Sequence, residues 1–343
     1  MAADAPYPPS DAIASLTFDW STHVRLAPGS DNWPITWADD DEQYTSWGDG
    51  GGFDGTNEHG RVSNGFARIE GNAESYRGVN TAGGVNAPSP TPFTGKCYGI
   101  VSAKGMLYSW RTGDASGETA YRFQELWKSS DRGVTWVATK VRFAREDFTG
   151  GDAGFFAPTF LQCGRDYADA LDEYLYCHAT NVKTESWDIH RPGEIILMRV
   201  PVTELEAPAA YSFYAGHNVE GKPLWTSNVL ERTPVWQDTT TGAMMASACL
   251  IPGLGRIVLT VEHSDKAQGN IGVYESETPW GPWRTVCFEE QWGADHIESS
   301  TFFWNFAPKW FNDDGSEFTL VFTGRGSNDS WNSVKGRFIR PKT

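Results

Sequence analysis

Pairs of short alternating apolar runs joined by tight turns recur along this chain, and this recurrence constrains the fold more than any other feature. In each pair, a run of alternating apolar residues is followed by a turn rich in Gly, Asp, Asn or Pro and by a second alternating run, which is typical of a β-hairpin. Five such hairpins are present, over residues 34–48, 97–110, 158–179, 244–262 and 301–323. They begin about every 60 to 85 residues, a spacing that suits one propeller blade plus insertions.

A third strand is expected after several hairpins, over residues 124–127, 194–200, 270–275 and 333–339. The sequence therefore predicts an all-β fold: a single five-bladed β-propeller of four-stranded antiparallel blades over residues 16–340, preceded by an extended N-terminal tail over residues 1–15. The early strand over residues 16–20 is expected to join the last blade and close the ring, because closure removes unpaired strand edges.

Charge limits the class of partner. The chain carries 28 Lys and Arg against 44 Asp and Glu, a net charge of −16, so neither nucleic acid nor an anionic membrane finds a basic surface. No run of about 18 apolar residues predicts a membrane-spanning helix. The N-terminus lacks a basic, apolar leader and resembles the mature end of a secreted or periplasmic protein. We expect a monomer that binds a polysaccharide or oligosaccharide.

No metal or cofactor is predicted. The five cysteines lack C-x-x-C spacing, which argues against a zinc site or a redox motif. Cys163 and Cys177 can face each other across a hairpin, but buried free thiols are the expected state. The acidic turns over residues 39–41 and 313–314 lack the D-x-D-x-D-G spacing of a calcium loop, so a structural calcium ion stays a minor alternative.

Propeller topology selects the candidate functional residues, because the starts of first strands and the ends of second strands share one face of the disc. The candidate catalytic residues on this face are Asp31, Asp49, Glu262, His263 and Glu298. The candidate substrate-binding residues are Trp33, Lys96, Arg111, His178, Asn181, Arg325 and Trp331. Sugar faces stack on indole rings and sugar hydroxyls bind carboxylates and amides, so this set favours a carbohydrate site.

Two carboxyl groups can divide acid and base work across a glycosidic bond, so the first hypothesis is a glycoside hydrolase. Asp49 is expected to be its base or nucleophile, and Glu262 or Glu298 its acid. The alternative role for Asp49 is purely structural, because it lies in a Gly-Asp-Gly turn.

Two rival hypotheses stay open. A polysaccharide lyase would use His263 or His178 as base, a Tyr as proton donor, and Arg325 or Arg111 to neutralise a uronate carboxylate. A non-catalytic carbohydrate-binding propeller would instead depend on its tryptophans, Trp33 and Trp331.

Residues 129–136 resemble the sialidase Asp-box, S-x-D-x-G-x-T-W, a structural signature of propeller turns. More broadly, residues 31–39 followed by 44–50, together with 279–283 and 318–324, resemble a bacterial five-bladed propeller family long catalogued as a domain of unknown function, some members of which are endo-D-arabinanases. In those relatives a Gly-Asp-Thr follows the first hairpin. The resemblance implies a role for Asp49 in the Gly48-Asp49 pair, whereas Gly50 replaces the Thr and departs from the arabinanase pattern.

Overall fold

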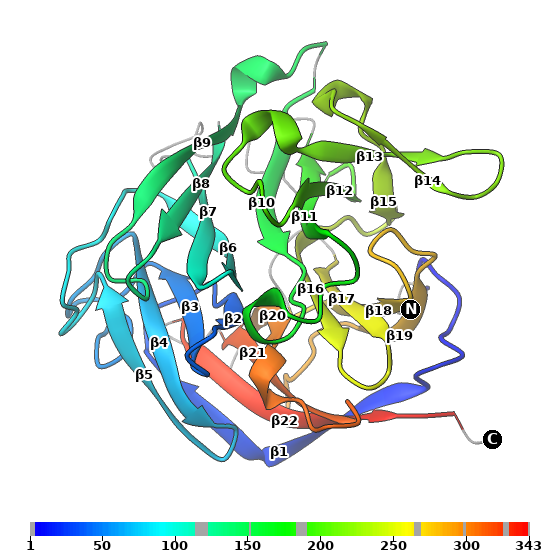
Figure 1. Ribbon diagram of the computed structural model, residues 1–343. Helices are drawn as coiled ribbons and strands as arrows, with labels where there is room; N and C mark the ends of the chain where they lie inside the picture. Colours follow the sequence, from blue (N-terminus) through cyan, green and yellow to red (C-terminus); the bar gives the residue numbers. More distant parts are fainter. Residues whose placement is uncertain are drawn as a thin grey trace.

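Five antiparallel sheets radiate from a central axis in the computed structural model (Figure 1). The structure describes residues 4–113, 123–150, 152–182, 191–263, 269–297, 300–324 and 329–341. Helical structure in these residues is limited to five 3₁₀ turns of three residues each. The predicted five-bladed propeller is confirmed, and the five expected hairpins form the two innermost strands of each blade. No helix among the described residues is long and apolar enough to span a membrane.

The strands follow chain order from the axis outward. Blade 1 contains β2 (Ile35–Trp37), β3 (Gln43–Gly48), β4 (Asn64–Asn72) and β5 (Ser75–Ala82). Blade 2 contains β6 (Lys96–Ala103), β7 (Met106–Thr112), β8 (Phe123–Ser129) and β9 (Val137–Ala144). Blade 3 contains β10 (Gly154–Phe160), β11 (Tyr174–Val182), β12 (Glu194–Pro201), β13 (Ser212–His217), β14 (Pro223–Thr226) and β15 (Pro234–Gln237). Blade 4 contains β16 (Met244–Ile251), β17 (Arg256–Glu262), β18 (Ile271–Ser276) and β19 (Arg284–Glu289). Blade 5 contains β20 (Thr301–Phe306), β21 (Glu317–Gly324), β22 (Trp331–Ile339) and β1 (Ser15–Leu26). The 3₁₀ turns are η1 (Arg145–Asp147), η2 (Arg165–Tyr167), η3 (Pro208–Ala210), η4 (Val229–Glu231) and η5 (Pro308–Trp310).

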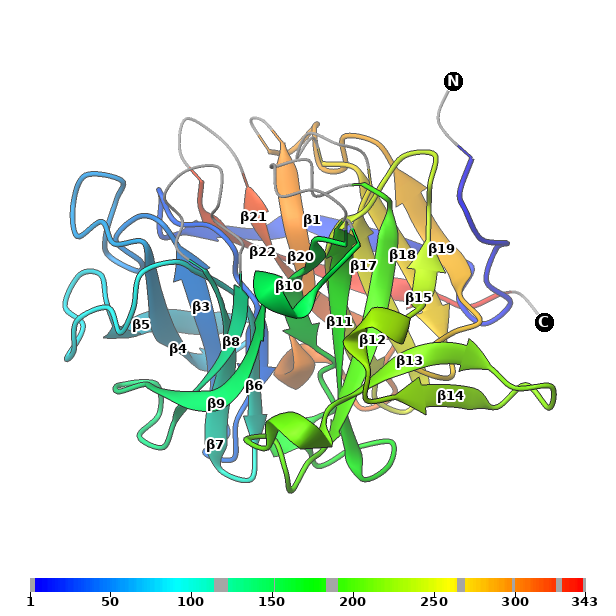
Figure 2. The ribbon, with the colours of Figure 1, turned by 90° about the horizontal axis from the view of Figure 1, so that it is seen from above.

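Blade 3 departs from the predicted four strands. Its β13 pairs with β12 only at Met198 and Arg199, and then leaves the sheet to form a hairpin with β14 that projects from the side of the disc (Figure 2). The vacated edge of β12 is covered by β15, which pairs with Glu194–Ile196. The blade therefore has six strands, and the extra hairpin is a surface addition that the inner ring does not need.

The first strand in the sequence closes the ring. β1 pairs antiparallel with β22 from Ser15–Ile339 to Leu26–Trp331, with an irregularity between Asp19 and Val24. The predicted closing strand is confirmed and extends six residues beyond its expected end at Trp20. Because β1 pairs along β22, the edge of β22 that faces away from β21 is covered along this length. The two ends of the chain are thereby joined in one blade.

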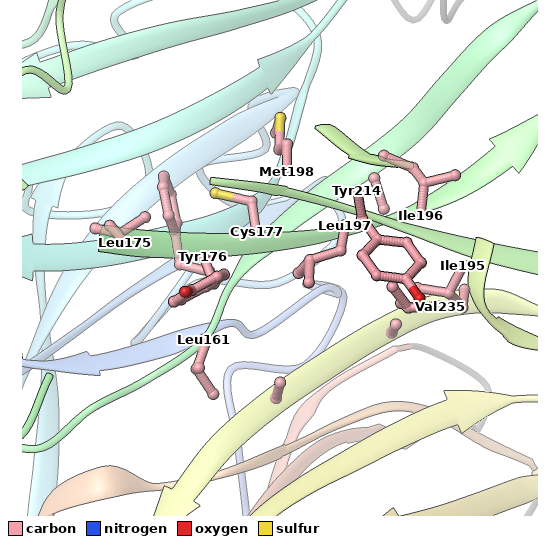
Figure 3. Close-up of a cluster of buried hydrophobic side chains, with 14 of the residues drawn as sticks. Leu161, Leu175, Tyr176, Cys177, Ile195, Ile196, Leu197, Met198, Tyr214 and Val235 are labelled. Carbon is pink, nitrogen blue, oxygen red and sulfur yellow. The ribbon is translucent and has the colours of Figure 1, made fainter. Parts of the chain in front are cut away.

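The core lies between neighbouring blades, where apolar side chains from adjacent sheets interdigitate. In the largest cluster, the second and third strands of blade 3 contribute Leu175, Cys177, Ile195 and Leu197, each at most 1% exposed (Figure 3). All five cysteines are free thiols. Burial raises the pKa of the Cys163 thiol to about 12, so this group stays protonated at neutral pH.

A tight turn after β8 links blades 1 and 2. The Asp131 carboxylate accepts hydrogen bonds from the Thr135 amide and hydroxyl (2.8 and 2.6 Å) and from the Ser129 hydroxyl (2.8 Å). This turn places the Trp136 ring against Phe66 of β4, with 4.0 Å between ring centroids. The turn therefore packs its tryptophan between blades 1 and 2.

Each innermost strand has a bulge near its start. In β6, β10, β16 and β20 the pairing with the second strand of the blade shifts in register within the first few residue pairs. Blade 1 has a similar shift just before β2, between the Asp31–Gly48 bridge and the Ile35–Thr45 pair. At four of the five bulges one residue has a left-handed backbone, namely Asn32, Ala157, Met245 and Phe303, with φ of 57°, 49°, 44° and 52°. Bulges re-aim side chains. Tyr98, Ala157, Met245 and Phe303 from four different blades accordingly share one buried cluster.

Removing the closing strand tests its role. A chain that begins at residue 27 leaves the β22 edge unpaired and exposes the apolar cluster around Phe318 and Phe338, so we expect loss of the cooperative thermal transition and aggregation on size-exclusion chromatography. A chain that begins at residue 6 keeps β1 and Tyr7 and serves as the control. An unchanged melting temperature for the longer deletion would contradict the account of closure.

Candidate functional site

The innermost strands all begin at one face of the disc, which we call the upper face and which lies at the top of Figure 2. The second strands of the blades end at this same face. The polar residues of blade 1 and their neighbours from blade 2 form a charged group there that includes a solvent-accessible carboxylate, and they define the candidate site.

An ion-pair cluster joins blades 1 and 2 at the upper face. The Lys96 ammonium at the start of β6 lies 2.6 Å from Oδ1 of Asp49, and Nη2 of Arg61 lies 3.3 Å from the same oxygen. The Lys96 side chain is 12% exposed, while that of Asp49 is 36% exposed. Asp49 is therefore a solvent-accessible carboxylate held by two cations. Its backbone is left-handed, with a φ of 53°, a strained conformation that often marks functional sites.

Asp31 lies against the same cluster. Its backbone exchanges two hydrogen bonds with Gly48 (2.9 and 2.7 Å), and its Oδ1 accepts a hydrogen bond from the Asn32 amide (2.8 Å). A Cβ added to Gly48 would lie 2.5 Å from Oδ1 of Asp31 and 3.0 Å from Cδ of Lys96. Gly48 is thus required for space, because Asp31 and Lys96 both approach its backbone closely.

Asn32 occupies the bulge position at the start of the inner strand of blade 1 and has an amide side chain there. Its counterparts in the other blades, Tyr98, Ala157, Met245 and Phe303, belong to the buried cluster on the axis. Asn32 is 3% exposed, and its Oδ1 has no hydrogen-bond partner among the described residues. Blade 1 therefore places an amide and a carboxylate where other blades place mainly apolar groups, and Asn32 is positioned to orient Asp31.

The loop that carries Asp49 is anchored by Trp47. A Cβ added to Gly52 or Gly65 would lie 2.4 or 2.2 Å from Cζ2 of the Trp47 ring, so the indole packs directly on the backbone at both positions. Trp47 itself is fully buried. The glycine-rich sequence after β3 is thus explained by close packing around this ring, which fixes the loop and with it Asp49.

A second polar network lies at the upper end of blade 3. Arg232, whose side chain is 3% exposed, donates two hydrogen bonds to Asp152 (2.8 Å each) and two to Oδ1 of Asn181 (2.7 and 3.2 Å). Nδ2 of Asn181 in turn donates to Glu194 (2.7 Å). Burial alone raises the pKa of Asp152, but the hydrogen bonds from Arg232 and from the Gly154 amide outweigh it and hold the pKa below its ordinary value. Asn181, an expected substrate ligand, is therefore engaged in an internal network.

Blade 4 contributes Glu262 and His263 at the end of β17. Glu262 is fully buried and pairs with Met244, beside the bulge of β16. His263 is 1% exposed, stacks on Phe288 with 3.9 Å between centroids, and donates from Nε2 to the Glu289 carbonyl (3.2 Å). Burial lowers the pKa of His263, so the ring stays neutral. The structure brings these two residues to the upper face but leaves neither side chain open to solvent.

Several expected binding residues are buried or paired with other protein groups in the structure. Trp33 and Trp331 are fully buried against each other, with 5.4 Å between their rings, because the bulge region folds the indoles into the core between blades 5 and 1. His178 is fully buried and donates from Nε2 to the Pro279 carbonyl (2.9 Å), which ties blade 3 to blade 4. Arg111 pairs with Glu125 (3.1 Å) and the Thr94 carbonyl (2.7 Å).

Glu298 and Arg325, expected at the same face, lie outside the described residues. Sequence reasoning missed Asn32, Arg61 and Arg232. Asn32 follows a candidate aspartate directly and could have been found from that position, whereas Arg61 and Arg232 lie in loops without any motif. Among the described residues, no three His, Cys, Asp or Glu side chains gather closely enough to hold a metal ion.

Comparisons with known proteins agree with this fold. Residues 104–297, more than half of the chain, match the family model described as "Domain of unknown function (DUF4185)". No curated protein matches the sequence.

Solved structures with the same fold include three glycoside hydrolases. The RS223 β-xylosidase is 10% identical with a TM-score of 0.54, and the match covers 91% of this chain and 94% of the other. The GH43_1 enzyme from Xanthomonas citri is 11% identical with a TM-score of 0.52, covering 94% and 92%. The GH62 α-L-arabinofuranosidase catalytic domain from Coprinopsis cinerea is 11% identical with a TM-score of 0.51, covering 96% and 98%. At this level of identity the likeness shows a shared fold.

The crowding at Gly48 generates one prediction. In a Gly48→Ala variant the new methyl group displaces Asp31, so a crystal structure should show the carboxylate moved away from Lys96, and the unfolding free energy should fall by about 1–3 kcal/mol. Gly272→Ala, with a comparable clash against Tyr274 in blade 4, is the matched control and should leave Asp31 in place. An unmoved Asp31 in the Gly48→Ala variant would contradict the described packing.

His178 generates a second prediction. Burial lowers its pKa from 6.5 to about 4, so the folded protein holds the ring neutral while the unfolded chain protonates it below pH 6.5. The stabilisation is complete above pH 6.5 and is lost as the pH falls toward 4, a change of about 3 kcal/mol in unfolding free energy. Urea titrations across this pH range should show a flatter dependence in His178→Gln than in the wild type or in the exposed-site control His296→Gln. Equal slopes would refute the assignment.

Proposed function

The chain belongs to the DUF4185 family, and we propose that it is a glycoside hydrolase that cleaves a polysaccharide at the upper face of the propeller. The proposal is supported by the shared fold of three glycoside hydrolases, one of which, the enzyme from Xanthomonas citri, has also been solved with xylotriose. A secreted or periplasmic location, a monomeric state and a single domain over residues 16–340 stay predictions that fit this role.

The observation that carries the proposal is that two carboxylates, Asp49 paired with Lys96 and Asp31 packed beside Gly48, lie close to Lys96 at the upper end of blade 1. Glycoside hydrolysis needs one carboxyl group to protonate the leaving oxygen and one carboxylate to act as base or nucleophile. Oδ1 of Asp49 already contacts two cations, so its role in the proposal is to hold the Lys96 ammonium and fix the local charge. We therefore assign the base or nucleophile to Asp31, which the Asn32 amide orients.

The proposed general acid is Glu262 or Glu298. Glu262 ends β17 in blade 4, and blade 4 lies across the axis from blade 1 (Figure 1), so the two carboxyl groups belong to opposite sides of the ring, although the Glu262 side chain is fully buried. The separation of the two carboxyl groups decides the stereochemistry: about 5 Å gives retention of configuration, and about 6.5–9.5 Å gives inversion.

Two isosteric substitutions test the roles. Asp31→Asn removes the charge that the reaction needs and should lower kcat by about 10³-fold or more while leaving the melting temperature nearly unchanged. Asp49→Asn loosens Lys96 and should lower kcat less, by about 10- to 100-fold. The substrate is first identified by a polysaccharide screen with mass analysis of the products.

Asp313→Asn is the matched control, because Asp313 is exposed in a turn on the opposite face. Ordinary turnover by Asp31→Asn would refute the assignment of the base. A larger loss in Asp49→Asn than in Asp31→Asn would return that role to Asp49.

The rival hypotheses have less support. A lyase needs a histidine base, yet burial lowers the pKa of both His178 and His263 and so makes each ring a weaker base. A binding-only propeller needs exposed indole platforms, yet Trp33 and Trp331 are buried. Unsaturated products with new ultraviolet absorbance would favour the lyase, because elimination leaves a double bond conjugated to the carboxylate.

A further inference from the structure

A groove of about 650 Å³ lies on the lower face of the disc, opposite the candidate active site. It runs between blades 5 and 1 and is bounded by residues 17–19 of β1, the β4–β5 turn at 72–74, residues 309–312 at η5, the start of β21 at 317–319 and the end of β22 at 335–339. These segments come from opposite ends of the chain and meet only because the ring closes here.

Aromatic rings form much of the groove. Phe18 and Phe311 line it with partly exposed rings, whereas Trp310 and Phe318, also in the lining, are nearly buried. Trp310 is held by Tyr76 of β5 with 4.7 Å between ring centroids. Two lining side chains also have unused hydrogen-bonding capacity: Nε1 of Trp310 and Oγ1 of Thr319 have no partner among the described residues, although these side chains are only 6% and 2% exposed. Buried polar atoms are rarely left without a partner, because each costs about 1–3 kcal/mol.

The charges around the groove are paired. The Lys335 ammonium lies 2.6 Å from Glu74 and links blade 5 to blade 1, Arg337 pairs with Glu317, and Lys309 lies 3.3 Å from Asp41. Each cation already has a carboxylate partner, so the groove has no excess positive charge to attract an anion. The paired carboxylates still have oxygen lone pairs that can accept hydrogen bonds from hydroxyl groups.

We propose that this groove is a second carbohydrate-binding site, which takes a segment of a neutral oligosaccharide. Aromatic rings stack on the apolar faces of sugar rings, while the rim of paired carboxylates, ammonium groups and amides binds hydroxyls as both acceptor and donor. The site is separate from the upper face and does not depend on that face being catalytic. It gives the protein a means to hold a polysaccharide chain away from the point of cleavage.

Ala73 offers a way to block the groove without disturbing the core. It lines the groove in the β4–β5 turn and is partly exposed, so Ala73→Trp fills the space with an indole. Ala209→Trp, at an exposed position in η3, is the matched control for an added surface tryptophan. All variants carry Asp31→Asn as well, which keeps the probe oligosaccharides intact during titration if the upper face is catalytic.

Isothermal titration with xylohexaose and cellohexaose, and with a galacturonan hexamer as the charged comparison, tests the proposal. We expect a binding event for at least one neutral hexaose that weakens at least tenfold in Ala73→Trp and is unchanged in Ala209→Trp, with no comparable event for the uronate. Thr319→Val, which removes only the hydroxyl, should weaken the same event about threefold or more. Loss of catalysis in Asp31→Asn with this event retained separates the groove from the proposed active site.

Three results would overturn the proposal: no binding of either neutral hexaose, neutral binding that Ala73→Trp leaves unchanged, or equal or tighter binding of the uronate at the groove. The melting temperatures of Ala73→Trp and Thr319→Val should remain within a few degrees of the parent, so a lost binding event reports on the groove and not on unfolding. Replacement of the Glu74 carboxylate in Glu74→Gln provides a second check, because it keeps the side-chain size and leaves Lys335 unpaired. Uronate binding gained in this variant would support the view that charge pairing sets the preference for neutral sugars, and its absence would contradict that view.

Discussion

The pairing of β1 with β22 is the constraint on which the rest of the structure depends. It supplies the outermost strand of the last blade from the start of the chain, and it also sets where the chain enters the first blade: β1 ends at Leu26 on the upper face, and the following residues lead directly to Asp31. Asn32 is then fixed to the last blade by a hydrogen bond from its backbone amide to the Thr323 hydroxyl (3.0 Å). The groove on the lower face therefore lies at the seam between blades 5 and 1, and the hydrogen bond from Asn32 attaches one side of the candidate site, which continues to Lys96 of blade 2, to the same seam.

The second organising feature is the bulge at the start of each inner strand. A regular strand would alternate its side chains between the two faces of the blade, whereas the bulge turns one residue out of that alternation. In blades 2 to 5 the residues at the bulges fill the axis with apolar groups. In blade 1 the same device places Asn32 beside Asp31, and this difference between otherwise similar blades is the physical basis for placing the chemistry there.

The inner architecture could be predicted from the sequence because both strands of each inner hairpin are buried and their apolar runs are strong, as in β16 and β17, whose bounds agree with the expected ones. The outer strands are half exposed, as in β9, so their patterns were too weak to place, and the β13–β14 hairpin gave no signal at all. The face that carries Asp31, Asp49 and Lys96 followed from strand direction alone. Strand direction did not reveal which side chains point into solvent. Trp33 lies before the start of an inner strand and His178 near the end of a second strand, yet packing between blades buries both side chains.

The central claim is that the upper face hydrolyses a glycosidic bond. The most direct measurement is the mass of the products released from a panel of polysaccharides in water enriched in ¹⁸O. Hydrolysis places one heavy oxygen at each cleaved bond, so the account predicts oligosaccharides that are two mass units heavier than those formed in ordinary water. Products that are 18 units lighter than hydrolysis products and carry no ¹⁸O would identify elimination, and the absence of any cleavage across the panel would leave the propeller without the proposed activity; either result would contradict the claim.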